Sequence, residues 1–218
     1  IADEKGDTPF MINFFTTTNH DPYKVPESYE SRIPKFKMGK EKYIRAKRTM
    51  AYNDIVLSEF FEEAKTHDWY DNTIFIITAD HGLNIHRNIP NHPLNGHIPF
   101  IIYSPMIDSP IELDKIVSQI DILPTLLDLI GENHFLPQLY GNSGLKGGDG
   151  FACRVSHKNL QWITPNHTYY EFMGSDKHQL FTYSSIWDEV YTELPTSNPR
   201  FNMLKTQGQH YIQDLSLI

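Results

Sequence analysis

The chain has 218 residues, of which 39% are hydrophobic, and its 27 acidic and 19 basic residues give a formal charge of −8. This apolar content supports a folded core in one large domain and excludes intrinsic disorder. The acidic balance excludes a nucleic-acid-binding protein that uses a basic face, and the single cysteine excludes an internal disulfide. No apolar run approaches the about 18 residues that a membrane helix needs.

The first half of the chain predicts strands and a long helix. Residues 11–15 (Met-Ile-Asn-Phe-Phe) predict a buried strand, which ends in a polar loop around His20. Residues 23–40 are polar and indicate a surface excursion. From 42 to 64, apolar residues recur every three or four positions, which predicts a helix.

Two further strands and a short helix follow. Residues 74–78 form a continuous β-branched run that predicts a central parallel strand buried on both faces, and 99–103 predict a second such strand. A helix is expected over 123–130, with Asp121 as its N-cap, a proline in its first turn and Gly131 at its C-terminus. This alternation is typical of an α/β sheet covered by helices.

The C-terminal third has a different texture. Five glycines between 141 and 150 predict a loop, and an amphipathic helix is expected over 200–214. Four short runs between them predict a small antiparallel sheet: 151–155, 160–164, 167–172 and 180–183. We therefore expect an α/β part over 1–135 and a small β-rich subdomain over 136–218.

Histidines gather after the 74–78 strand, where four of them fall within 17 residues: His81, His86, His92 and His97. In open α/β sheets, ligands bind at the C-terminal ends of the strands. Asp80 and His81 offer an oxygen and a nitrogen suited to Zn²⁺ or Mn²⁺. The alternative is an aspartate that caps the next turn beside a structural histidine.

The predicted role of His20 depends on the arrangement of the sheet. His20 ends the first predicted strand, so in one parallel sheet it would converge on the same edge as Asp80 and His81. Without that sheet, His20 is a loop histidine with no partner. Taken alone, His92 and His97 are typical of surface histidines.

The order of motifs over residues 9–131 resembles the C-terminal half of the sulfatase branch of the alkaline phosphatase superfamily. Within that branch, the chain is most similar to lipoteichoic-acid-synthase-like phosphoglycerol transferases and to phosphoethanolamine transferases. The resemblance implies the C-terminal part of an alkaline-phosphatase-like α/β/α sandwich, with a small antiparallel sheet and a terminal helix. The motifs that carry it are Pro9-Phe10, Thr18-Asn19-His20-x-Pro22, Ala51-Tyr52-Asn53-Asp54, Tyr70-Asp71-Asn72-Thr73, Asp80-His81-Gly82, Gly96-His97-Ile98-Pro99 and Gln119-Ile120-Asp121-Ile122-x-Pro124-Thr125.

The same resemblance implies roles for site residues. Asp80 and His81 would bind a divalent metal (Mn²⁺, Zn²⁺, Mg²⁺ or Ca²⁺), and three histidines would contact the substrate: His20, His92 and His97. The nucleophile, a threonine or a formylglycine, would lie upstream, so no catalytic nucleophile is expected in this chain. Cys153 is followed by Arg-Val-Ser, which lacks the Cys-x-Pro-x-Arg pattern of sulfatases and predicts a small buried residue. Leu83 stands where the family usually has glutamate.

Two hypotheses follow. In the first, the chain, which opens at Ile1 without an initiator methionine, is part of an enzyme that transfers or hydrolyses an anionic phosphodiester or sulfate ester, lipid-linked substrates included. The transferase form would lie outside the cytoplasm of a bacterium and meet the membrane only through missing N-terminal helices. In the second, it is a non-catalytic anion-binding module or an inactive family member. Because only two metal ligands are visible, we expect the chain alone to be inactive.

Overall fold

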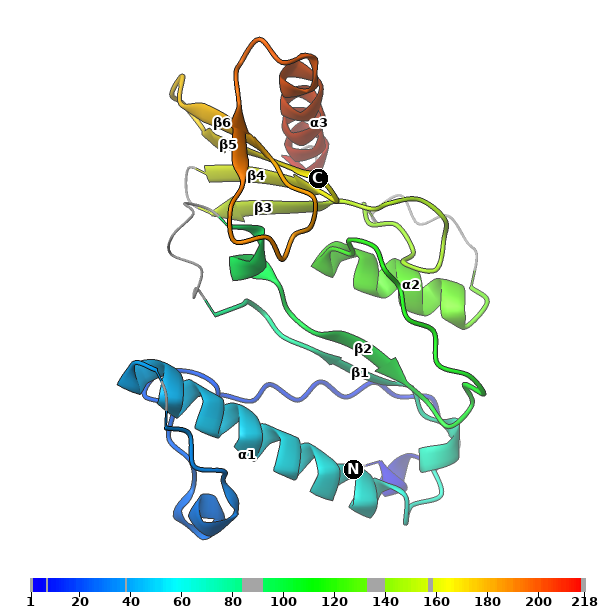
Figure 1. Cartoon of the computed structure of the whole chain (residues 1–218). Helices are drawn as coiled ribbons and strands as arrows, with labels where there is room; N and C mark the ends of the chain where they lie inside the picture. The colour runs from blue at the N-terminus through cyan, green and yellow to red at the C-terminus, as the bar shows by residue number, and fades with distance from the viewer. Residues whose placement is uncertain are drawn as a thin grey trace. The chain divides into compact units, whose positions relative to one another are not determined.

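The computed structural model of the chain describes residues 2–6, 8–37, 39–83, 92–132, 140–156 and 159–216 (Figure 1). The chain divides into two compact units. Unit 1 comprises Ile1–Ile76 and Ile102–Ser109, and unit 2 comprises Ile77–Ile101 and Pro110–Ile218. The predicted division at residue 135 stays a prediction. The helices are α1 (Glu41–Ala64), α2 (Ile122–Leu129) and α3 (Pro199–Ser216), and the strands are β1 (Phe75–Thr78), β2 (Phe100–Tyr103), β3 (Ala152–Ser156), β4 (Asn159–Thr164), β5 (His167–Phe172), β6 (His178–Thr182) and β7 (Thr192–Leu194).

Helix α1 confirms the helix predicted over 42–64 and supplies the aromatic core of unit 1. The ring of Phe61 meets those of Phe75 and Tyr103 edge to face, at centroid distances of 5.0 and 5.3 Å. The hydroxyls of Tyr70 and Tyr103 are hydrogen-bonded at 2.6 Å, and this bond is the main reason why the pKa of Tyr70 is raised to about 12. These rings join the helix to the short strands β1 and β2.

Residues 11–15 correct a prediction. They are extended but pair with no strand in the described part of the chain, and Met11, Phe14 and Phe15 are 87%, 75% and 72% exposed. Strand-like composition favours an extended backbone, whereas burial requires neighbouring strands and covering side chains. For the same reason β1, predicted to be buried on both faces, is only half-buried, since its described sheet partner is β2.

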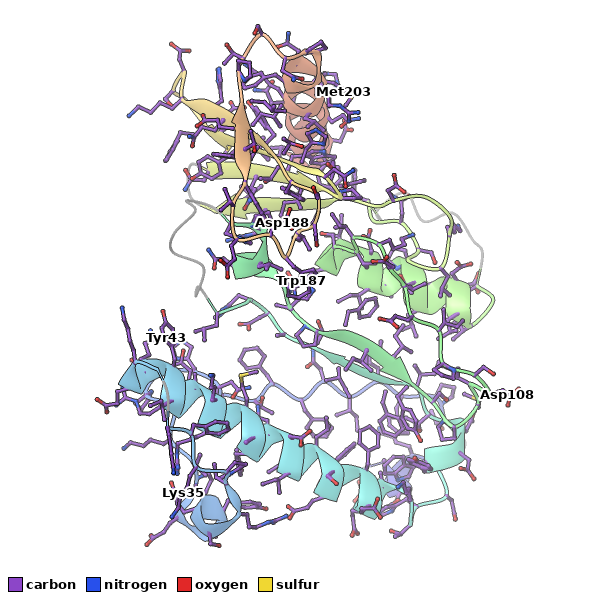
Figure 2. The ribbon with its side chains drawn as sticks, viewed as in Figure 1. Lys35, Tyr43, Asp108, Trp187, Asp188 and Met203 are labelled. Atoms are coloured by element: carbon purple, nitrogen blue, oxygen red, sulfur yellow. The ribbon has the colours of Figure 1, made fainter. Side chains whose placement is uncertain are left out.

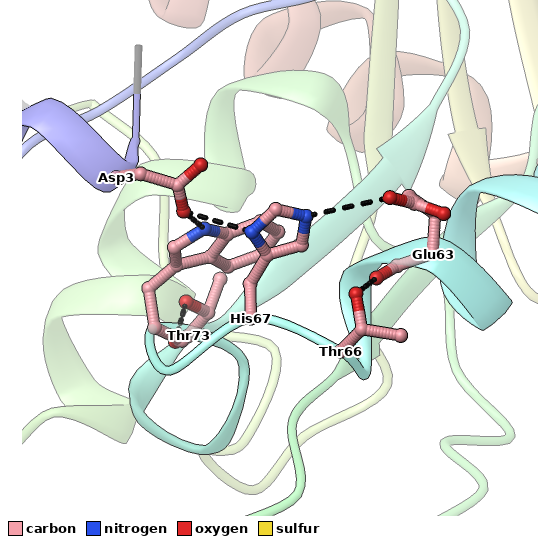
Figure 3. Close-up of polar contacts among 6 residues, drawn as sticks. Asp3, Glu63, Thr66, His67 and Thr73 are labelled. Atoms are coloured by element: carbon pink, nitrogen blue, oxygen red, sulfur yellow. Dashed lines mark hydrogen bonds and ion pairs between the residues drawn. The ribbon is translucent and has the colours of Figure 1, made fainter.

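The N-terminal turn η1 (Asp3–Lys5) is fastened to the segment that follows α1 (Figure 3). One carboxylate oxygen of Asp3 accepts a hydrogen bond from Trp69 Nε1 at 2.9 Å and lies 2.8 Å from His67 Nδ1. The ring of His67 stacks on Trp69 at 5.2 Å. The hydrogen bond with His67, followed by that with Trp69, lowers the pKa of Asp3.

We expect this fastening to weaken in acid. A carboxyl group whose pKa is lowered by folding stabilises the folded state above its unfolded pKa, and that contribution is lost as pH falls through the folded value. The indole N–H NMR signal of Trp69 should therefore shift below about pH 4. The signal of Trp162, which lies in unit 2, should stay in place. Asp3→Asn should abolish the shift, and a titration that persists in this variant would contradict the assignment.

The small antiparallel sheet predicted for the C-terminal third is confirmed in unit 2. Strands β3 to β7 lie in chain order and each is antiparallel to the next. The four predicted runs correspond to β3–β6, whereas the three-residue β7 is too short to carry a pattern. Helix α3 confirms the predicted terminal helix. It packs on the sheet through a buried cluster of Leu160, Trp162, Tyr169, Leu180, Phe201 and Leu204.

The predicted glycine-rich loop before β3 is confirmed. Both ends of this loop pack tightly against the backbone of the segment before α2. A Cβ atom on Gly141 would stand 2.1 Å from the carbonyl oxygen of Ile120, and one on Gly150 would stand 1.9 Å from that of Ile116. Both positions therefore require glycine. At Gly147, in the middle of the loop, a Cβ atom would meet nothing within 4 Å.

Candidate functional site

Asp80 and His81 lie in the turn that follows β1. Their side chains are 58% and 69% exposed. One oxygen of Asp80 accepts the His81 backbone N–H at 2.9 Å, and the other lies 3.9 Å from His81 Nε2. His81 Nδ1 lies 3.1 Å from the carbonyl oxygen of Gly82. The turn thus presents one carboxylate oxygen and one ring nitrogen side by side at the surface of unit 2.

The backbone of this turn is held by Gln119. Its side-chain amide donates hydrogen bonds to the carbonyl oxygens of Ala79 at 2.8 Å and Asp80 at 3.0 Å. These carbonyls come 40 and 39 positions earlier in the chain, respectively. Gln119 belongs to the quoted family motif, but the sequence assigned it no role, because a bond to a distant backbone has no local pattern. It is a positioning residue for Asp80.

Gly82 holds the turn from a second direction. A Cβ atom at this position would stand 2.7 Å from the carbonyl oxygen of Asn95 and 2.9 Å from that of His97. Such a contact is shorter than side-chain carbons tolerate, so only glycine allows this approach. The Asp80–His81 turn and the segment that ends at His97 are therefore packed backbone against backbone.

Asp121 stabilises the segment that carries Gln119. Its predicted role as the N-cap of the helix over 123–130 is corrected. Its carboxylate accepts the backbone N–H groups of Ser118 and Asn142, both at 2.7 Å, rather than capping α2. Ser118 and Asp121 form a capping box around the 3-10 turn η5 (Gln119–Asp121). The N-cap of the helical segment therefore lies three residues earlier than predicted, at Ser118, which the Ser-x-x-Asp spacing could have indicated.

His97 lies just before β2 and is exposed. Its carbonyl packs on Gly82, and its ring meets that of Trp187 edge to face at 5.4 Å. The structure therefore brings His97 next to the turn of Asp80 and His81, as a substrate-side residue requires. Its predicted role stays a prediction.

His92 has a different environment. It is 2% exposed, its Nδ1 accepts the Leu94 backbone N–H at 3.2 Å, and its Nε2 lies 3.4 Å from the carbonyl oxygen of Asp188. The ring also packs on Tyr191 at 4.7 Å. This geometry suits a histidine that orders two loops, while its predicted contact with the substrate stays a prediction.

His20 lies in unit 1, is exposed, and has Nδ1 3.2 Å from the carbonyl oxygen of Asp21. Its convergence with Asp80 and His81 stays a prediction, because the latter belong to unit 2. His86 lies outside the described residues.

The donor set at the turn fits part of a metal centre. A carboxylate and an imidazole suit Zn²⁺ or Mn²⁺, and a closed zinc site has about four ligands. Within the described ranges, no three His, Cys, Asp or Glu side chains form a group able to hold a metal ion. Asp80 and His81 therefore fit as two ligands of a larger set.

None of the described helices has the length and apolar character of a membrane-spanning helix.

Cys153 has the environment of a structural residue. It pairs with Trp162 across β3 and β4 and packs against the buried cluster under α3. Burial raises the pKa of its thiol to about 11, so the reactive thiolate is less than about one in a thousand molecules at neutral pH.

We expect iodoacetamide to alkylate Cys153 slowly in the folded chain and rapidly in urea. Mass spectrometry measures the rate of alkylation. Equal rates in the folded chain and in urea would contradict this packing.

Comparison with known proteins defines the class. The sequence model of the family described as Sulfatase matches residues 1–132, which is more than half of the chain. The chain therefore belongs to the sulfatase family, within the alkaline phosphatase superfamily. This confirms the resemblance drawn from the motifs.

The relatives include a lipoteichoic acid synthase-like protein and an arylsulfatase. The lipoteichoic acid synthase-like protein YvgJ of Bacillus subtilis is 28% identical over 177 residues, which cover 74% of this chain and 28% of the relative. Arylsulfatase K of Bos taurus is 32% identical over 154 residues, covering 63% of this chain and 28% of that protein. A solved protein of the alkaline phosphatase superfamily from Vibrio parahaemolyticus matches with a TM-score of 0.76 and 28% identity, over 97% of this chain and 52% of that one. The chain thus spans just over a quarter of these curated relatives and about half of the solved structure.

Proposed function

We propose that the chain is the C-terminal part of a metal-dependent sulfatase-family enzyme that transfers or hydrolyses an anionic ester. The substrate would be a phosphodiester, of phosphoglycerol or phosphoethanolamine type, or a sulfate ester. The observation that carries the proposal is the exposed Asp80–His81 pair, whose turn is held by Gln119 and Gly82. The named relatives, a lipoteichoic acid synthase-like protein and an arylsulfatase, support these two substrate classes.

Four of the candidate residues have a proposed role in catalysis. Asp80 and His81 would hold the divalent cation, which when bound supplies positive charge that stabilises a negatively charged ester group. His97, and His20 from unit 1, would donate hydrogen bonds to the transferred group, because an imidazole N–H stabilises charge that develops on an oxygen. The nucleophile, a threonine or a formylglycine, would come from outside this sequence and form the covalent intermediate.

The proposed setting is the extracytoplasmic face of a bacterial membrane. The support is the similarity to a lipoteichoic acid synthase-like protein. In this setting the substrate would be lipid-linked, and transmembrane helices upstream would anchor the enzyme.

The alternative function is a non-catalytic anion-binding module. One observation favours it: within the described residues the turn supplies a pair of candidate ligands rather than a full set. A module of this kind would bind phosphate or sulfate esters without turning them over.

The coding sequence upstream of Ile1 tests the proposal, together with assays of the whole protein on bis(p-nitrophenyl) phosphate and p-nitrophenyl sulfate. A threonine nucleophile after transmembrane helices, with phosphodiester turnover, would support the transferase branch. A Cys/Ser-x-Pro-x-Arg motif after a signal peptide, with sulfate release, would support the sulfatase branch. If neither motif is present and neither ester is cleaved, the enzyme proposal fails and the binding module stands.

A further inference from the structure

The loop between β6 and β7, residues 183–191, has a backbone fixed by its own side chains. One carboxylate oxygen of Asp188 accepts the backbone N–H groups of Ser184 at 2.9 Å and Ser185 at 3.1 Å. The hydroxyl of Tyr191 donates to the carbonyl oxygen of Ile186 at 2.8 Å. These bonds tie the beginning, middle and end of the loop together, so the residues at its tip have defined positions.

The loop also stands on a buried base. Its first and last residues, Tyr183 and Tyr191, are 6% and 8% exposed and have ring centroids 4.4 Å apart. The buried ring of His92 packs on Tyr191 and reaches the backbone of Asp188. The loop is therefore attached to the same segment that leads into His97.

This fixed loop presents a large aromatic side chain to solvent. Trp187, beside Asp188 at the tip (Figure 2), is 66% exposed. Its ring meets that of His97 edge to face, with an interplanar angle of 84°, and His97 rests on Gly82, which follows the Asp80–His81 pair. Burial of an indole side chain favours folding, so a built loop that holds it outward indicates a surface that binds something else.

We propose that Trp187 and His97 form a subsite for a neutral six-membered ring in the alcohol part of the ester, beside the Asp80–His81 turn. The inference deepens the proposed function and rests on it. An indole face stacks on the flat face of an aromatic or sugar ring, and a ring nitrogen of His97 bonds a hydroxyl group next to it. The neighbouring acidic residues Asp188 and Glu189 disfavour an anionic group at this position. An acyclic glycerol phosphate offers no face for stacking.

Ligand binding to the full 218-residue chain tests the subsite without requiring turnover. The indole N–H NMR signal of Trp187 is followed while methyl β-D-glucopyranoside, benzyl alcohol or glycerol 1-phosphate is added. The sugar or the aromatic alcohol should shift this signal saturably, and the two arms show which ring is preferred. Trp187→Ala, with binding followed by saturation-transfer NMR of the ligand, should weaken it about tenfold, whereas Trp187→Phe should keep it within about threefold.

Val190→Ala is the matched control, because Val190 lies on the same loop and is 79% exposed; it should leave the affinity unchanged. The inference is overturned if neither ring compound shifts the Trp187 signal, if only glycerol 1-phosphate does, or if Trp187→Ala binds as well as the unchanged chain. Failure of the proposed function would look different: the whole protein would cleave no ester while ring binding at Trp187 persisted.

Discussion

The purified chain should leave bis(p-nitrophenyl) phosphate and p-nitrophenyl sulfate intact and should bind Mn²⁺ or Zn²⁺ weakly. Asp80 and His81 supply two donors, and two protein ligands hold a divalent ion far less tightly than about four do. We expect dissociation constants in the millimolar range, on the order of a thousandfold weaker than a complete site. Calorimetry with each metal and absorbance assays of both esters measure these quantities.

Asp80→Ala is the matched variant for the weak metal site. It should abolish the residual metal binding, whereas Asp114→Ala, at an exposed aspartate in the same unit, should leave it unchanged. Robust turnover of either ester by the purified chain would show that the chain itself carries a nucleophile. That result would contradict the assignment of this group to an upstream segment.

Asp121→Ala should destabilise the chain by about 3 kcal/mol, because it removes two hydrogen bonds from backbone N–H groups to a charged acceptor. Asp121 is 8% exposed, and its carboxylate binds both Ser118 and Asn142. For a chain of this size, the loss corresponds to a fall in Tm of about 10 °C. Thermal unfolding followed by circular dichroism measures it.

The Tm of Asp121→Asn should lie between those of Asp121→Ala and the unchanged chain, since an amide keeps one acceptor oxygen in place of two. Asp114→Ala serves again as the control and should change Tm by less than about 2 °C. If Asp121→Ala unfolds at the temperature of the unchanged chain, the two short bonds to Ser118 and Asn142 do not hold the segment that carries Gln119.

Elements with a strong local pattern could be predicted from the sequence. The stripe of apolar residues gave α1 and α3 to within two residues, and the short strand-like runs gave β3–β6 with their antiparallel order. In each case the pattern lies within one stretch of chain, and each strand pairs with the next strand along the chain, although α1 and α3 pack on residues that are distant in sequence. The same holds for Gly131, whose positive φ of 77° ends α2 as predicted.

Features that depend on distant partners could not be predicted. The apolar run at 11–15 specifies an extended backbone, but its exposure depends on what pairs with it. Asp80 and His81 were found because they follow a strand and match a motif. The residues that hold their turn, Gln119 and Gly82, act through backbone atoms far along the sequence, and such contacts leave no periodic signal.

The glycine-rich loop before β3 offers a practical entry point for protein engineering. Its two ends are locked by Gly141 and Gly150, whereas Gly147 faces open space. An affinity peptide spliced in after Gly147 would leave both locked ends unchanged, and exposed loop tips are where inserted sequence is best tolerated. The chain could then be tagged internally, with its N-terminal turn and helix α3 unmodified, to capture the polypeptide segments that associate with it.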